Sequence, residues 1–357
     1  MVGTTLITSA LGVAFWLIAA HSFSKPAVGV ASAAVAAMTL FGFMGTLGLG
    51  TLLMGELPRR SDGHRSLLNA ALLINVVAGT ALGLGFALIA PVISSNLDPL
   101  GESIPSIAFF AIGVGLTALA FVLDQALIGL MHGGLQLVRN VVFALVKLLA
   151  LLAIAVFVAS ATAPWIYGAW AVGIAASLTV LVRFYARRDG DALRPSFVLL
   201  VQMRAAAASH AAVNLALETA DLAMPILVVS LLSASANASF YIAWMIAGFL
   251  VMVPLSLSMV AYAIGSVDAD GLSRRFRFTF AISLGFGLVA NLVLLPAASP
   301  ILQVFGQSYA DQGTLPLHIL ALGVFPLTFK THYVAIHRVE RRLGSALPIV
   351  WGGTLLE

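Results

Sequence analysis

Long, nearly uninterrupted apolar runs dominate this chain, and short polar connections separate them. A helix that crosses the bilayer core needs about 20 apolar residues. The predicted spans are residues 3–22, 27–54, 66–93, 104–131, 138–160, 164–185, 207–232, 237–264, 277–297 and 313–336, with a shorter apolar stretch at 343–356. The runs are continuous and do not alternate, which favours helices over the strands of a membrane barrel. The pattern predicts an all-α integral membrane protein with about 10 to 11 transmembrane helices.

The composition supports this fold class and removes several others. Hydrophobic residues make up 61% of the chain and charged residues 9%, with a mean hydropathy of +1.06, so a soluble domain is excluded. The net charge is +4, but the sequence lacks the basic and aromatic context of a nucleic-acid surface, so we expect no nucleic-acid partner. The chain has no cysteine, which excludes disulfides and thiolate metal sites. We expect no cofactor and no metal.

Positive charges fall almost entirely in every second connection between the predicted spans. Seventeen of the eighteen lysines and arginines lie in or near these connections, and Lys25 is the exception. Lysine and arginine in short loops stay on the cytoplasmic side of a membrane. The sequence therefore predicts a multi-pass protein of a cell membrane with a cytoplasmic N-terminus.

The most polar connection, 186–206, divides the chain into two parts. Residues 1–185 hold six predicted spans, and residues 207–357 hold four and the short stretch. The two parts have similar residues at the ends of corresponding spans. GELPRR at 55–60 corresponds to GLSRRFR at 271–277, and Pro91 corresponds to Pro300. Parallel repeats of this kind are typical of two-lobed transporters. We expect two pseudo-symmetric helical lobes with a substrate pathway between them.

Three segments carry a family resemblance. They are residues 20–60 (AHSFSKPAVGVASAAVAAMTLFGFMGTLGLGTLLMGELPRR), Asp221 with the following stretch to Tyr241, and VFGQSYADQGTLPLHILALG with Phe305, Gly306 and Tyr309. These segments resemble the polysaccharide flippases that export O-antigen and exopolysaccharide lipids. The resemblance implies that Gly29 starts the second helix and that Leu47, Gly48 and Leu49 end it before a basic connection. That family belongs to the superfamily of multidrug, oligosaccharidyl-lipid and polysaccharide exporters.

The resemblance implies a function and a location. Such a protein moves a lipid-linked oligosaccharide, a polyprenyl-diphosphate sugar, from the cytoplasmic to the outer leaflet of a bacterial inner membrane by alternating access. It serves polysaccharide or lipopolysaccharide synthesis, with polysaccharide polymerases or glycosyltransferases as partners. Members have twelve to fourteen helices, so the C-terminal lobe is expected to be incomplete. His21 also departs from the arginine that is common at its position.

Ionisable side chains within membrane spans are costly and are functional candidates by default. On the seventh span, Asn214, Glu218 and Asp221 share one helix face. Two carboxyl groups one turn apart in a low dielectric cannot both ionise cheaply. They either bind a coupling ion, H⁺ or Na⁺, or form hydrogen bonds to neighbouring helices.

Two lysines lie deeper than the other positive charges. Lys147 and Lys330 are each eight residues from an arginine on the cytoplasmic side, which is about 12 Å along a helix. They either meet the pyrophosphate of the substrate or extend back to the interface. As a third alternative, Asp124, with Gln125 and Asn140, forms a structural pair with Lys147.

Two further functions remain open. One is a MATE-like, cation-coupled exporter of small molecules or drugs, for which an acid-lined aromatic cavity is expected. The other is a membrane-embedded glycan polymerase or transferase. The predicted outer connections are all short and no nucleophile or metal cluster is evident, which favours a transporter over an enzyme. Eight glycines form small-residue patterns that are expected to pack helices closely: Gly45, Gly48, Gly50, Gly79, Gly83, Gly85, Gly285 and Gly287.

Overall fold

The computed structural model describes residues 2–59, 64–158, 160–186, 195–267, 272–339, 348–349 and 352. The secondary structure of these residues is helical, with no strand among them. Helices satisfy every backbone hydrogen bond within one segment, which is what a lipid environment requires of an open chain. The predicted all-α fold class is therefore confirmed.

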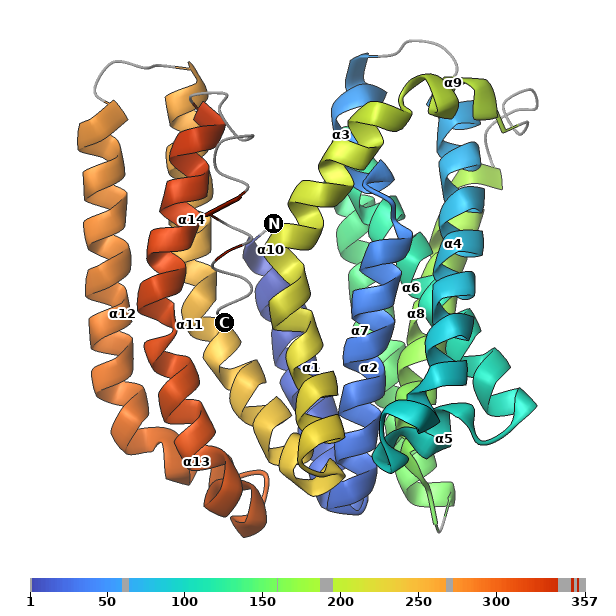
Figure 1. Ribbon diagram of the computed structural model, residues 1–357, viewed down its shortest axis with the longest axis vertical. Helices are drawn as coiled ribbons and strands as arrows, with labels where there is room; N and C mark the ends of the chain where they lie inside the picture. The colour runs from blue at the N-terminus through green and yellow to red at the C-terminus, as the bar shows by residue number, and fades with distance from the viewer. Residues whose placement is uncertain are drawn as a thin grey trace. The chain divides into compact units, whose positions relative to one another are not determined.

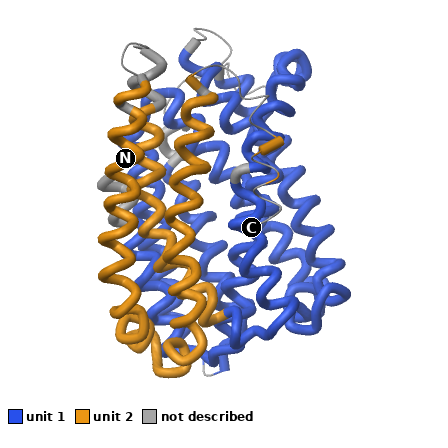
Figure 2. The backbone as a smooth tube through the Cα atoms, turned by 60° about the vertical axis from the view of Figure 1, so that its left-hand side comes forward, with its two compact units in different colours: residues 1–237 blue, residues 238–357 orange. Residues whose placement is uncertain are grey.

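Contacts divide the chain into two compact units, residues 1–237 and 238–357, which Figure 2 colours separately. The first unit contains α1 (Val2–Ser22), α2 (Lys25–Gly45), α3 (Leu49–Glu56), η1 (Leu57–Arg59), α4 (His64–Ile93), η2 (Ser95–Leu97), α5 (Asp98–Gly101), α6 (Ile104–Gly129), α7 (Gly133–Phe157), α8 (Ala163–Ala186), α9 (Phe197–Gln202) and α10 (Arg204–Leu231). The second contains most of α11 (Ala234–Val267), α12 (Leu272–Gln303), α13 (Gln307–Leu322) and α14 (Val324–Val339).

Eight described helices are long and apolar enough to cross a membrane, or nine when the two parts of α10 count as one span. These parts, Arg204–Ala216 and Glu218–Leu231, meet at an angle of 51°. With the shorter apolar helix Thr8–Ser22, every one of the ten predicted long spans corresponds to a described helix or helix pair. The stretch 343–356 lies outside the described residues, apart from 348, 349 and 352, as do Arg60, Arg187, Arg188, Arg194, Arg341 and Arg342.

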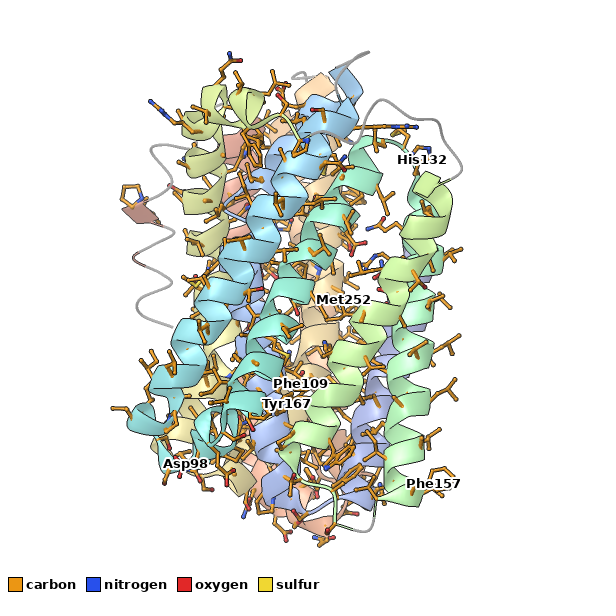
Figure 3. All side chains as sticks on the ribbon, turned by 90° about the vertical axis from the view of Figure 1, so that its right-hand side faces the viewer. Asp98, Phe109, His132, Phe157, Tyr167 and Met252 are labelled. Atoms are coloured by element: carbon orange, nitrogen blue, oxygen red, sulfur yellow. The ribbon has the colours of Figure 1, made fainter. Side chains whose placement is uncertain are left out.

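The helices of the first unit run between two ends, as Figure 1 shows. The short helices α3 and α9 lie near one end of this unit, and α5 lies near the other. Figure 3 places His132, before α7, at the first end, and Asp98 and Phe157 at the second. At the second end, Ser103 caps α6 by accepting a hydrogen bond from the Ser106 backbone N–H at 3.3 Å. Serine caps of this kind satisfy donors that a helix leaves free at its start.

Close glycine contacts hold α2, α4 and α6 together. A Cβ placed on Gly45 would come within 2.7 Å of the Gly79 Cα, and one placed on Gly83 within 2.7 Å of the Val114 Cβ. Real Cβ atoms do not approach this closely, so these positions need glycine. The prediction that the glycine pattern packs helices is confirmed for Gly45, Gly79 and Gly83. It is wrong for Gly85 and Gly285, where an added Cβ would meet nothing within 4 Å.

A left-handed break separates α2 from α3, although the sequence predicted one continuous span here. Leu47 and Gly48 have φ angles of 50° and 73°. A Cβ on Gly48 would meet the Ala207 carbonyl oxygen at 2.2 Å and the Ala211 nitrogen at 2.5 Å. The backbone of α10 thus lies directly on this break, which explains why α10 packs with the first unit. The lobe boundary predicted at 186–206 rests on an internal sequence repeat, whereas the two compact units are defined by contacts. The lobe boundary therefore stays a prediction.

The second unit is an antiparallel helical assembly in which α12 packs against α13 and α14. The Asn291 amide on α12 donates to the Gly287 oxygen at 2.9 Å and to the Ala321 oxygen on α13 at 3.1 Å. His332 on α14 is buried beside the Phe280 ring, with a centroid distance of 5.4 Å. These polar contacts fix neighbouring helices where apolar packing alone is weakly directional.

Candidate functional site

Arg139 is buried in α7, and its guanidinium forms four hydrogen bonds to partners from three helices. Its Nε donates to Asp124 Oδ1 on α6 at 2.9 Å, and one terminal nitrogen donates to Asp124 Oδ2. That nitrogen also donates to Asn140 Oδ1 at 3.0 Å, and the other donates to Ser177 Oγ on α8 at 3.2 Å. Only 3% of the Arg139 side chain and 22% of the Asp124 side chain are exposed. This arrangement is a bidentate pair, the strongest geometry for such ions.

The pair corrects two sequence interpretations. Arg139 was assigned to the region of a connection, but α7 begins at Gly133, so Arg139 lies inside the helix. Asp124 and Asn140 were candidates to pair with Lys147, but both contact Arg139. The physical reason is the α6–α7 hairpin: Asp124 and Arg139 are nearly equidistant from its turn, so antiparallel packing brings them to the same level. The equal spacing of Asp124 and Arg139 from the connection was the sequence signal for this ion pair.

Lys147 lies two helical turns further along α7 and is 3% exposed. Its Nζ lies 3.6 Å from the ring centroid of Trp170 on α8, 4.5 Å from Phe143 on α7 and 5.4 Å from Phe15 on α1. We call these three rings the aromatic cage. No carboxylate or hydrogen-bond acceptor contacts Nζ among the described residues, so cation–π attraction compensates its charge.

The aromatic cage is a rigid structure built by packing. The Phe15 and Phe143 rings both meet Trp170 edge-on, at centroid distances of 5.6 and 5.4 Å. Helix α8 approaches α7 closely here, because a Cβ on Gly173 would lie 2.8 Å from the Lys147 Cβ and 2.9 Å from the Phe143 oxygen. Trp170 on α8 is a wall of this cage.

The other candidate residues lie on α10 and α14. On α10, Asn214 donates to Thr51 Oγ1 on α3 at 3.0 Å, which ties α10 to the first unit. Glu218 and Asp221 are exposed and lie beyond the bend of α10. Lys330 is half-buried on α14 in the second unit, whereas Lys147 belongs to the first. The roles of these four residues stay predictions.

A second polar cluster joins the start of α11 to α2 inside the first unit. The Asn237 amide donates to the Gly29 oxygen at 2.8 Å and to Ser32 Oγ at 3.1 Å, and all three residues are buried. Gly29 was expected to start the second helix, but α2 begins at Lys25, so Gly29 lies one turn inside it. Asn237 was not singled out from the sequence. An asparagine at the start of an apolar segment was the available signal in the sequence, since most buried polar side chains form at least one hydrogen bond.

Comparisons with known proteins agree with this architecture. Residues 211–344 match the MatE family model. A multidrug resistance MATE family transporter of the MOP superfamily, in its inward-facing conformation, has a TM-score of 0.71 at 14% identity, covering 99% of this chain and 84% of that one. The chain has the fold of the MOP-superfamily transporters.

Two further solved structures share this fold. The lipid II flippase MurJ, in an inward closed conformation, has a TM-score of 0.75 at 11% identity, covering 99% of this chain and 78% of that one. A MOP superfamily transporter from Pyrococcus furiosus has a TM-score of 0.57 at 12% identity, covering 99% of this chain and 83% of that one. The binding pocket of that transporter is described as having reverse polarity, which suggests a different function for it. No match was found among curated proteins. The relatives are transporters or flippases, and the MOP transporter fold agrees with the predicted multi-pass membrane protein.

Proposed function

We propose that this protein moves an anionic lipid-linked oligosaccharide, a polyprenyl-diphosphate sugar, from the cytoplasmic to the outer leaflet by alternating access. The N-terminus is cytoplasmic in this proposal, and the membrane is a bacterial inner membrane. The resemblance of residues 20–60 to polysaccharide flippases and the fold shared with a lipid II flippase support it. Partner enzymes would be polysaccharide polymerases or glycosyltransferases that make or use the same lipid.

The observation that carries the proposal is the charge balance inside the first unit. Lys147 is a buried cation compensated by rings, whereas the partly buried carboxylate of Asp124 is already neutralised by Arg139. When it is protonated, the Lys147 ammonium attracts an anion in this low dielectric: at 8 Å and an effective dielectric of 20 the attraction is about 2 kcal/mol per unit charge. A pyrophosphate carries two charges, so it gains most from such a site.

Lys330 would provide a second positive charge from the other unit, and Glu218 with Asp221 would bind a coupling ion, H⁺ or Na⁺. Each of these roles is part of the proposal and is open to the same variant analysis. The two acids lie three residues apart on one face of α10.

Depletion of the protein tests the substrate. We expect a lipid-linked oligosaccharide to accumulate on the cytoplasmic leaflet, detected by its protection from a membrane-impermeant glycosidase. Complementation with Lys147→Met should restore export at only about one-tenth of the wild-type rate. A loss of about 1–2 kcal/mol in substrate binding corresponds to a reduction of this size. Arg204→Met, which removes a positive charge from the exposed first residue of α10, is the control and should complement fully.

The second candidate is a cation-coupled exporter of small molecules, favoured by the MatE match over residues 211–344 and by the two acids on α10. Under this alternative, depletion leaves the lipid-linked sugars distributed normally and lowers the efflux of a cationic dye. That pair of results would rule out the flippase.

A further inference from the structure

The aromatic cage has the construction of a site for an organic cation. Trp170, Phe143 and Phe15 surround one point from three helices, with Nζ of Lys147 at 3.6, 4.5 and 5.4 Å from their centroids. Cages of aromatic faces are how proteins recognise quaternary ammonium groups, because each ring face carries partial negative charge. In this chain the occupant is the ammonium of the protein's own lysine.

We propose that Lys147 fills an organic-cation site from within and thereby determines the charge selectivity of the first unit. With its ammonium in place, the cage has no room for a second cation and repels one electrostatically. Without it, the cage accepts a small quaternary ammonium ion. This proposal concerns which ligands the cage excludes. It can therefore be right or wrong independently of the proposal that the substrate is a lipid-linked oligosaccharide.

Three features of the structure carry the inference. The cage is preformed, because Phe15 and Trp170 meet edge-on and Phe15 is fully buried. The ammonium has no carboxylate partner among the described residues, so its removal leaves no orphaned acid. The nearest mapped ion pair on α7, Arg139 with Asp124, is self-contained and would keep the helices in place.

The geometry also specifies the ligand's size. Truncation of Lys147 to alanine removes everything beyond Cβ, and tetramethylammonium is similar in size to the group removed. The close approach of α8 at Gly173 fixes the base of this space, because a Cβ there would already touch the Lys147 Cβ. Larger drug cations are therefore expected to bind less well than tetramethylammonium.

The experiment titrates tetramethylammonium chloride into the purified full chain and follows tryptophan fluorescence, since Trp170 and its neighbour Trp16 report on the cage. We expect saturable binding to Lys147→Ala at least about tenfold tighter than to the wild type, with sodium chloride as the ionic-strength control. Lys147→Met is the matched control: it removes the charge but fills the space, so it should not bind. Adding Trp170→Leu to Lys147→Ala should abolish binding.

Two binding results overturn the proposal. One is that Lys147→Ala binds tetramethylammonium no better than the wild type. The other is that it binds neutral tert-butanol equally well, which would mean only an apolar cavity. If Lys147→Ala is recovered in low yield, tetramethylammonium present during extraction must raise that yield, because a bound ligand stabilises the folded state. No increase would equally overturn it. None of these readouts uses a lipid-linked sugar, so the flippase proposal is tested independently.

Discussion

Removing the carboxylate that faces Arg139 should strongly destabilise the first unit. In Asp124→Asn the side chain keeps its shape but loses its charge, so the buried guanidinium has no counter-ion. Breaking a buried pair from one side costs about 3–5 kcal/mol, since the remaining charge stays desolvated. The hydrogen bonds to Asn140 and Ser177 remain and keep the cost within this range.

This free energy converts into a measurable shift in melting temperature. A domain of 150–250 residues loses roughly 2–4 °C per kcal/mol, so the apparent Tm should fall by about 6–20 °C. The assay is thermal unfolding of the detergent-solubilised protein, followed by size-exclusion chromatography after heating. Glu102→Gln is the matched control, because Glu102 is exposed and its neutralisation should leave Tm within about 2 °C.

The double variant Asp124→Leu with Arg139→Met separates the pair's net contribution from the cost of an orphaned charge. Replacing both partners of a buried pair by apolar residues is often nearly neutral. We expect the double variant to recover most of the Tm lost in Asp124→Asn. An unchanged Tm in Asp124→Asn, or a double variant less stable than the single one, would refute the reasoning.

Three further predictions concern contacts within the first unit. Gly173→Ala should lower Tm and weaken substrate export, because the new Cβ pushes α8 away from the backbone of α7 at a cost of about 1–3 kcal/mol. Its control in thermal unfolding is Gly134→Ala, because a Cβ on Gly134 would meet nothing within 4 Å. Gly48→Ala should reduce the yield of folded protein more severely, since it combines a left-handed φ with a clash against α10, whereas Gly55→Ala in open space should not. Asn237→Ala should cost about 1–3 kcal/mol in thermal stability through two lost buried hydrogen bonds, and an unchanged Tm would contradict that role.

Part of the candidate site was readable from the sequence. Lys147 stood out because a charge within an apolar span is expensive, and Phe143 four residues earlier must share its helix face. Phe15 and Trp170 were not linked to it, since they lie far away in sequence on α1 and α8. Asp124 was recognised as a candidate but assigned to the wrong partner.

The sequence by itself determined which segments are helical, apart from the break between α2 and α3 and the bend in α10. In lipid each spanning segment must satisfy its own backbone hydrogen bonds, so an apolar run of sufficient length becomes a helix whatever its neighbours are. Only the tertiary structure decided which side chains meet. Spans such as α6 are apolar on most sides, so the sequence carries little information about how each helix is rotated about its axis. That rotation places Asp124 against Arg139 and leaves the ammonium of Lys147 to three aromatic rings.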